Sequence, residues 1–244
     1  HSRIHRLLRL PVFSMVVLFV MICLAIFAPI IAPHDENLGV LGDRHQPPVM
    51  FGGTPNHILG TDSLGRDVFS RVVFGARISM LSALSALIAG GAIGTSLGIL
   101  AGYRGGWVDE LIMRMVDVKF SIPLVLIAFA LVVIFNPSFG LMIGLLTMFV
   151  WGQFTRQVRA EVLVIKTTDY VTAARTWGAS PVQIMYRHIF PGVISTVLVI
   201  ATFQSGAVIL AEATLSFLGA GVPPPSPSWG SMIADARLYL DTAW

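Results

Sequence analysis

The sequence predicts an all-α protein that crosses a membrane several times. Hydrophobic residues make up 55% of the 244 residues, charged residues only 12%, and the mean hydropathy is +0.79. A soluble domain carries roughly twice that share of charge. Five apolar segments follow one another, each near the ~20 residues that a helix needs to cross a ~30 Å hydrocarbon core. They occupy residues 12–32, 78–101, about 115–135, about 139–160 and 191–218.

The first segment predicts an anchored helix rather than a cleaved leader. Residues 12–33 are 22 uncharged residues without a small-residue cleavage pattern, which is longer than the core of a secretory signal. A single cysteine, Cys23, excludes a disulfide framework and a cysteine metal site. The net charge of +3 includes only two lysines, so we expect no binding of nucleic acid.

The connection over residues 34–77 begins with turn-forming residues and then becomes amphipathic. Asp62 is a plausible N-cap, Asp67 and Arg71 have the spacing of a helical ion pair, and Val68 and Val72 begin an apolar face. We therefore expect a helix lying at the outer membrane surface before the second span. Either it anchors the protein structurally, or it forms a gate or a docking surface for a receptor.

Three histidines share this connection with acidic residues. His34, His45 and His57 show no tight ligand spacing in the sequence. We therefore expect them to be solvated rather than bound to a metal ion.

The second span carries a small residue at every fourth position. This spacing keeps the residues on one helix face, where another backbone can approach closely. The stripe predicts packing against a neighbouring helix of this chain or of a partner subunit. It consists of Ser82, Ala86, Gly90, Gly94, Gly98, Gly102 and Gly106.

The stripe also contains a formal match to the G-x-S-x-G nucleophile elbow, with Ser96 at its centre. That motif needs a strand-to-helix turn together with a histidine and an acid. Ser96 lies in the middle of an expected helix, so we do not expect catalysis. The third span must place Asp117 and Lys119 near the membrane interface, where lysine can extend toward water.

Residues 169–191, called the elbow below, are polar yet join two apolar segments. Asp169 is expected to cap a helix over 170–177, and Gly178 stands where a left-handed residue ends it. Ser180 then caps a second helix with Pro181 at its first position. The small residues Ala173 and Ala174 allow close approach. Such a shaped segment predicts a docking surface, the alternative being an ordinary solvated loop.

The distribution of lysine and arginine predicts the orientation. With the N-terminus inside, 11 of the 16 basic residues lie on the inner side. The positive-inside rule therefore places both the N-terminus and the elbow in the cytoplasm.

The fifth span contains Glu212, with Gln204 two helical turns earlier on the same face. A carboxylate within a membrane is expensive unless it is paired or faces water. Glu212 therefore either forms a structural pair or lines a transport pathway with Gln204. The proline-rich stretch 223–229 predicts a stiff outer connection.

The elbow resembles the coupling loop of ABC importer permeases, whose pattern is E-A-A, three residues, Gly, nine residues, then I-x-L-P. Ala173, Ala174, Gly178 and Pro191 match, whereas Thr172, His188 and Phe190 replace the family's Glu, Ile and Leu. The stretches LGTDSLGRDVFSR and LAEATLSFLGAGVPPPSPSWG resemble the C-type subunit of dipeptide, oligopeptide and nickel permeases. The outer signature supplies Gly60, Asp62, Gly65, Arg66, Asp67 and Arg71.

This resemblance implies the type I importer permease fold, with six spans of which five fall before Trp244. It implies an N-terminal part, 1–77, and a permease core, 78–244, whose coupling loop covers 166–190. It also implies a bacterial inner-membrane location, a second permease subunit, two ATP-binding subunits that hold ATP and Mg, and an extracytoplasmic substrate-binding protein. The coupling positions are Asp169, Thr172, Ala173, Ala174, Gly178, Ser180, Pro181, His188 and Pro191.

The sequence itself contains no G-x-x-x-x-G-K-[ST] phosphate loop, so a partner would have to supply the motor. The resemblance implies a transporter subunit rather than an enzyme, moving di- or oligopeptides or a related small solute by alternating access. The competing hypothesis is a proton-coupled transporter that uses Glu212 as its coupling acid. The cargo itself, whether dipeptide, longer peptide or nickel chelate, stays open.

Overall fold

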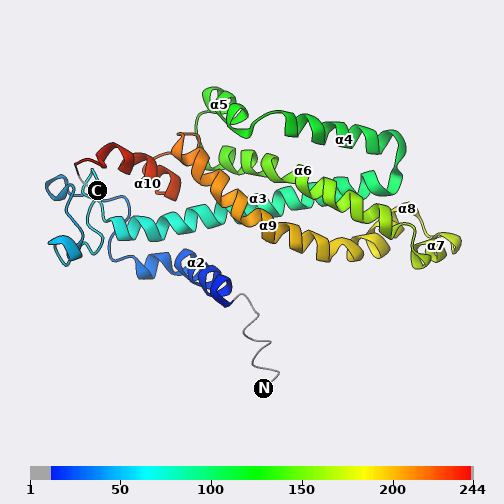
Figure 1. The fold of residues 1–244 in the computed structure, drawn as a ribbon, viewed down its shortest axis with the longest axis horizontal. Helices are drawn as coiled ribbons and strands as arrows, with labels where there is room; N and C mark the ends of the chain where they lie inside the picture. Colours follow the sequence, from blue (N-terminus) through cyan, green and yellow to red (C-terminus); the bar gives the residue numbers. More distant parts are fainter. Residues whose placement is uncertain (1–11, 243–244) are drawn as a thin grey trace, which may run out of the picture. The chain divides into compact units, whose positions relative to one another are not determined.

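The computed structural model describes residues 12–242, and the regular structure within them is helical apart from two isolated bridges (Figure 1). This confirms the all-α class. Two compact units form, one from residues up to Leu81 together with those from Ser216 onward, the other from Ser82 to Leu215. The longer helices are α2 (Val12–Ile31), α3 (Val68–Arg104), α4 (Gly106–Ser121), α5 (Leu124–Phe135), α6 (Phe139–Ile165), α7 (Asp169–Thr176), α9 (Phe190–Phe217) and α10 (Trp229–Ala236).

Four short turns and one short helix complete the described chain. They are η1 (Leu41–Asp43), η2 (Val49–Phe51), α8 (Pro181–Ile184), the π-helical turn η3 (Met185–Ile189) and η4 (Arg237–Tyr239).

Two helical segments of the described residues are long and apolar enough to cross a membrane. They are α3 and the continuous segment Pro181–Phe217, each of 37 residues. A third candidate is the pair α4 and α5, which is bent by 85°. Residues 16–31 form a shorter apolar helix. The full count of five spans stays a prediction.

The span expected over about 115–135 is not one continuous helix, because the helix breaks at Pro123. The ring of a proline disfavours the α conformation in the residue before it. Ile122 accordingly has extended backbone angles, with φ −109° and ψ 121°. Lys119, in the last turn of α4, donates from Nζ to the Phe149 carbonyl of α6 (2.6 Å) and so links the two helices.

The separate surface helix expected before the second span is also wrong. α3 begins at Val68 and continues unbroken to Arg104. Asp67 rather than Asp62 serves the helix start, since its Oδ2 accepts the Ser70 N–H (2.8 Å). Asp62 instead forms a turn, accepting the N–H groups of Leu64 and Arg66.

The glycine stripe of α3 faces α6 of the same chain. A Cβ atom on Gly98 would lie 2.8 Å from the Thr155 carbonyl oxygen, and one on Gly102 would lie 2.7 Å from Val162 Cβ. Gly90 and Gly94 are blocked similarly, by Val150 and by the Trp151 carbonyl. The stripe does not extend to Gly106, because α3 has ended and Gly106 has open space around it. Close backbone contact therefore fixes α6 against α3.

In the unit that includes the start of α3 and α10, Trp229 packs α10 against α3. Its Nε1 donates to the Val72 carbonyl (3.1 Å), and a Cβ on Gly75 would lie 3.1 Å from the indole ring. Ser228 and Ser231 form a capping box at the start of α10. The proline-rich stretch before it thus ends in a defined contact.

Candidate functional site

The bend of the elbow is made by backbone hydrogen bonds at Gly178. The Gly178 N–H donates to the Arg175 carbonyl (3.0 Å), and the Ala179 N–H donates to the Ala174 carbonyl (3.1 Å). These two bonds form a Schellman motif, which ends α7 with a left-handed residue. Gly178 has the required φ of +82°, which a residue with a Cβ atom reaches only with strain.

The second arm of the elbow starts at Ser180. Its Oγ accepts the Gln183 N–H (3.3 Å), and Pro181 takes the first helical position, where no N–H is needed. Asp169, by contrast, is the first residue of α7 and not its cap. Thr168 holds the cap position without a side-chain hydrogen bond. An acid in the first helical turn still favours the helix electrostatically.

The sequence predicted a second arm that ends before the fifth span, but the structure shows no break between them. α8, η3 and α9 form one continuous segment from Pro181 to Phe217. Pro191 would conflict with regular α-helical bonding to the carbonyl four residues earlier. The wider π-helical turn at Met185–Ile189 directly before it relieves that conflict. The elbow is therefore built into the same helical segment as the fifth span.

The underside of the elbow packs onto the ends of α3 and α6. Val171, Ile184 and Ile189 are buried in one cluster with Ile99 and Val162. Its outer side is open: Trp177 is 91% exposed, Tyr186 72% and Val182 68%. The family-pattern positions Thr172, Ala173 and Gly178 are exposed too, while Ala174 and His188 are partly buried.

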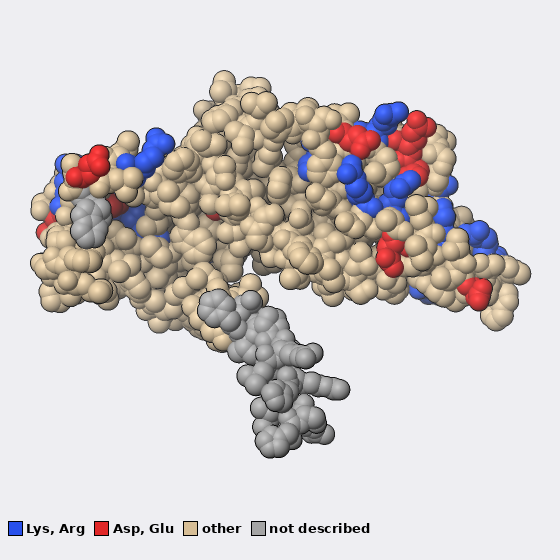
Figure 2. Space-filling view, viewed as in Figure 1, with Lys and Arg blue, Asp and Glu red and all other residues tan. Residues whose placement is uncertain are grey.

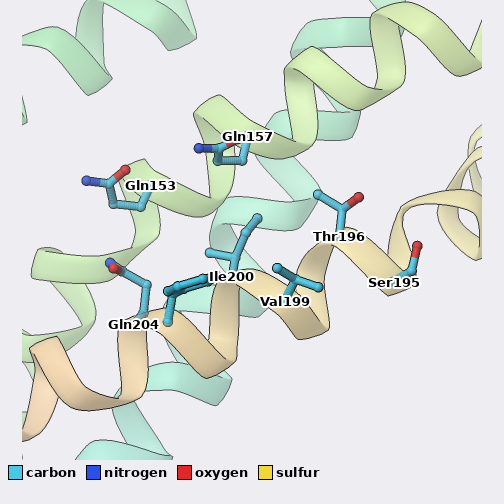
Figure 3. A pocket seen from close by; sticks show the side chains of 8 residues that line it. Gln153, Gln157, Ser195, Thr196, Val199, Ile200 and Gln204 are labelled. Atoms are coloured by element: carbon cyan, nitrogen blue, oxygen red, sulfur yellow. The ribbon is translucent and has the colours of Figure 1, made fainter. Parts of the chain in front are cut away.

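A hollow of about 430 Å³ lies between α6 and α9. Figure 3 shows Gln153 and Gln157 on α6, with Gln204 reaching toward them from α9. Ser195 and Thr196 add hydroxyl groups. The remaining lining residues are Val199, Ile200 and Phe203.

The hollow thus contains polar groups but no charged side chain. The sequence reasoning found Gln204 and missed Gln153 and Gln157. Two amides four residues apart within a largely apolar helix were the available signal.

Glu212 does not line this hollow. Its side chain is fully buried, and it interacts within the protein. The hollow therefore includes Gln204 but not Glu212. Burial favours the structural alternative for Glu212.

The outer signature residues hold the loop before α3 together. Gly60 and Gly65 have left-handed φ values of +76° and +75°. Asp62 binds Arg66 Nε (2.7 Å) and lies 3.5 Å from Arg71 Nε. The expected pair of Asp67 with Arg71 is wrong, because Asp67 contacts His57 at 3.0 Å.

The expectation of solvated histidines is wrong for His57, whose side chain is only 15% exposed. His45 packs against Tyr239 with tilted rings, whose centroids are 4.6 Å apart. Ser96 donates to the Ala92 carbonyl of its own helix (2.8 Å), as an ordinary helical serine does.

Charged side chains of the unit 82–215 gather where α4 begins, α6 ends and α7 lies (Figure 2). Arg159 of α6 binds Asp109 of α4, and Arg156 binds Asp117 at 3.0 Å. Lys166 donates to the Gly102 carbonyl at the end of α3 (2.7 Å). This charged end is the one that carries the elbow. Arg3, Arg6 and Arg9, which are among the 11 basic residues predicted on the inner side, lie outside the described residues.

Comparisons with known proteins identify a family. Residues 94–243 match the family described as "binding-protein-dependent transport system inner membrane component". Residues 8–48 match the N-terminal transmembrane domain of oligopeptide transport permease C.

Two relatives carry the name glutathione transport system permease protein GsiD. The protein from Pectobacterium atrosepticum is 40% identical over 222 residues, covering 90% of this chain and 72% of the relative. The protein from Escherichia coli is 42% identical over 218 residues, covering 89% and 70%.

Proposed function

Because the chain belongs to the family of inner membrane components of binding-protein-dependent transport systems, we propose that it couples ATP hydrolysis to import. It is an ABC importer permease of the peptide type. It pairs with a second permease subunit and receives cargo from an extracytoplasmic binding protein. Two ATP-binding subunits, which hold ATP and Mg, drive the cycle. The N-terminus and the elbow face the cytoplasm of a bacterial cell.

The observation that carries this proposal is the elbow's outer surface. Trp177, Val182 and Tyr186 expose large apolar side chains around a bend whose shape its own backbone fixes. Exposed apolar side chains gathered on a rigid segment are typical of a protein–protein contact. An ATP-binding subunit is the partner that the family supplies, so we assign this surface to it.

The continuity of the helix suggests how movement reaches the cargo. The segment Pro181–Phe217 begins in the elbow and carries Ser195, Thr196 and Gln204 at the hollow. A helix rises about 1.5 Å per residue, and its hydrogen bonds make it stiff. A displacement of the docked elbow would therefore tilt the wall of the hollow. This arrangement provides a physical route for alternating access.

The lining of the hollow supports a peptide-like cargo. Three amide side chains and two hydroxyl groups can exchange hydrogen bonds with peptide groups, and no lining charge selects one side-chain charge over another. Passage needs binding that is favourable but weak, which neutral groups provide. We propose a pathway for short peptides or for glutathione, the solute in the names of the relatives.

The test is transport in vesicles that contain the purified complex. Import should follow ATP hydrolysis and persist without a proton gradient. Import that needs a proton gradient and no ATP would instead support the proton-coupled alternative through Glu212.

Gly178→Val tests the elbow directly. Its Cβ meets no atom within 4 Å, so the substitution acts through backbone strain of about 1–2 kcal/mol rather than through a clash. We expect normal insertion, but weaker docking of the ATP-binding subunits or hydrolysis without transport. Gly178→Asn is the matched control, since asparagine tolerates left-handed angles.

Ala174→Arg should mimic Gly178→Val by placing a long charged chain at the contact. Normal coupling in both Gly178→Val and Ala174→Arg would reject the elbow as the coupling site.

A further inference from the structure

Three side chains that commonly bind metal ions meet at the start of α3. His34 follows α2, His57 follows η2, and Asp67 directly precedes α3. One ligand atom from each lies within 4.8 Å of the others. His57 Nδ1 is 3.0 Å from Asp67 Oδ1, and His34 Nδ1 is 3.9 Å from Asp67 Oδ2. We propose that this triad binds a divalent first-row transition-metal ion, for which Zn²⁺ is the best fit.

The spacing of the ligand atoms suits such an ion. Zn²⁺ binds nitrogen and carboxylate oxygen at about 2.0–2.2 Å in tetrahedral geometry, which separates neighbouring ligand atoms by about 3.3–3.5 Å. The two distances to Asp67 fall on either side of this value. Two imidazoles and one carboxylate favour zinc, nickel or copper, whereas magnesium and calcium prefer ligand sets made of oxygen.

Ser70 orients the carboxylate for this role. Its backbone N–H and its Oγ donate to Asp67 Oδ2 at 2.8 and 2.7 Å. The same Oγ accepts the backbone N–H of His34 at 3.1 Å. Oδ2 is therefore held by the protein, while the Oδ1 atom faces His57. Hydrogen-bonded ligands of this kind are characteristic of built metal sites.

The two histidines are held from both sides of the cluster. Arg71 Nη1 donates to the Glu36 carbonyl (2.8 Å), which fixes the chain next to His34 against α3. The backbone carbonyl of His57 accepts the Gly60 N–H (2.9 Å), and the backbone N–H of His57 donates to the Thr54 carbonyl (3.2 Å). The three ligands thus need only small side-chain movements to bind.

Charge and access are compatible with a bound cation. The nearby Arg66 and Arg71 both pair with Asp62, which offsets part of their charge. Asp67 is 1% exposed, whereas His34 is 40% exposed. The exposed side leaves a coordination position for water. An ion here would fasten the loop segments around His34 and His57 to the start of α3.

The test measures Zn²⁺ binding to the full chain in its untagged, metal-stripped complex, by calorimetry and by metal analysis. We expect one Zn²⁺ per chain that is lost or at least tenfold weaker in His57→Gln and Asp67→Asn. His45→Gln is the matched control, because His45 lies in the same loop but packs against Tyr239 instead. X-ray absorption of the zinc-loaded parent should show about two imidazoles at about 2.0–2.1 Å.

Acidification should weaken binding, because each imidazole must be unprotonated to bind the ion. His34→Gln provides a second variant should His57→Gln fail to assemble, since the exposed His34 is less involved in packing. Absence of Zn²⁺ binding in the parent would overturn the proposal. Equal affinity in the parent, His34→Gln and His57→Gln would overturn it as well, and would leave the contact of His57 with Asp67 as a structural hydrogen bond.

Discussion

The loop over residues 32–67, called the outer loop below, and the elbow after α6 both join apolar helices. The two regions use their side chains in opposite ways. In the outer loop the polar side chains bind one another, so that Arg71 and Asp67 are 4% and 1% exposed. In the elbow the backbone fixes the bend, and Trp177 remains 91% exposed.

This difference separates a region that is complete in itself from one that awaits a partner. Charged groups are costly to bury unless they are paired, so the outer loop must keep its pairs to remain folded. A bend fixed by backbone hydrogen bonds needs no large side chain on its outer face. Those side chains are therefore available for binding.

The largest effect should come from the close contact between α3 and α6. Gly94→Leu would force a side chain into the Trp151 carbonyl and to within 2.6 Å of Phe154 Cβ. We expect the complex to be lost or nearly lost, because overpacking costs about 1–3 kcal/mol or more. Gly144→Leu on α6 is the control, since nothing lies within 4 Å of its Cβ. Equal recovery of the two variants, measured by size-exclusion chromatography, would contradict the role of the glycine contact.

Asp62→Asn should destabilise the outer loop while leaving the elbow intact. It removes the carboxylate that pairs with Arg66 and with the buried Arg71. Breaking a buried pair typically costs about 3–5 kcal/mol, and we expect somewhat less because Asp62 is 19% exposed. Thermal unfolding followed by fluorescence should show a lower midpoint. Asp35→Asn is the control, because asparagine preserves the turn that this exposed carboxylate makes. A midpoint unchanged from the parent would mean that the pairs contribute little.

The same contrast explains what the sequence could predict. The turn at Gly178 and the cap at Ser180 depend on residues a few positions apart, so local patterns located them. The partners of Asp67 come from 10 and 33 positions earlier in the chain, His57 and His34, and no local spacing connects them. The hollow also needs α6 to meet α9, which the sequence of either helix alone does not specify.

The helix boundaries show a similar limit. Apolar composition located the segment that α4 and α5 form but not its bend at Pro123, since the two helices are each regular on their own. It also could not show that α3 starts at Val68, because the amphipathic and fully apolar parts of this helix have different patterns. α3 is one continuous helix, although its two sequence patterns predict two separate helices.

Trp177→Ala should affect the elbow alone. The side chain makes little contact with the rest of the chain, so the stability of the permease should not change. An exposed aromatic residue at the centre of an interface often contributes 2 kcal/mol or more, roughly a 30-fold change in affinity. Co-purification and titration of the ATP-binding subunits would measure that change. Trp107→Ala on α4 is the control, at 75% exposure. Similar effects of the two variants would remove the distinction between the elbow and the rest of the exposed surface.

The smallest effect should come from the hollow, which combines features of both regions. Its amides are polar like the outer loop, but they are left open as in the elbow. Gln204→Leu removes one hydrogen-bonding group from the lining, which is worth about 1 kcal/mol, or roughly fivefold. We expect transport to fall several-fold while the complex assembles and the ATP-binding subunits remain docked. Thr202→Val is the matched control on the same helix, since the Thr202 hydroxyl donates to the Leu198 carbonyl and does not line the hollow.

Combining Gln204→Leu with Gln153→Leu should reduce transport by less than the sum of the two single changes, in free energy, if both amides contact the same cargo group. Strict additivity would mean that they act independently, and unchanged transport in the double variant would exclude the hollow from the pathway.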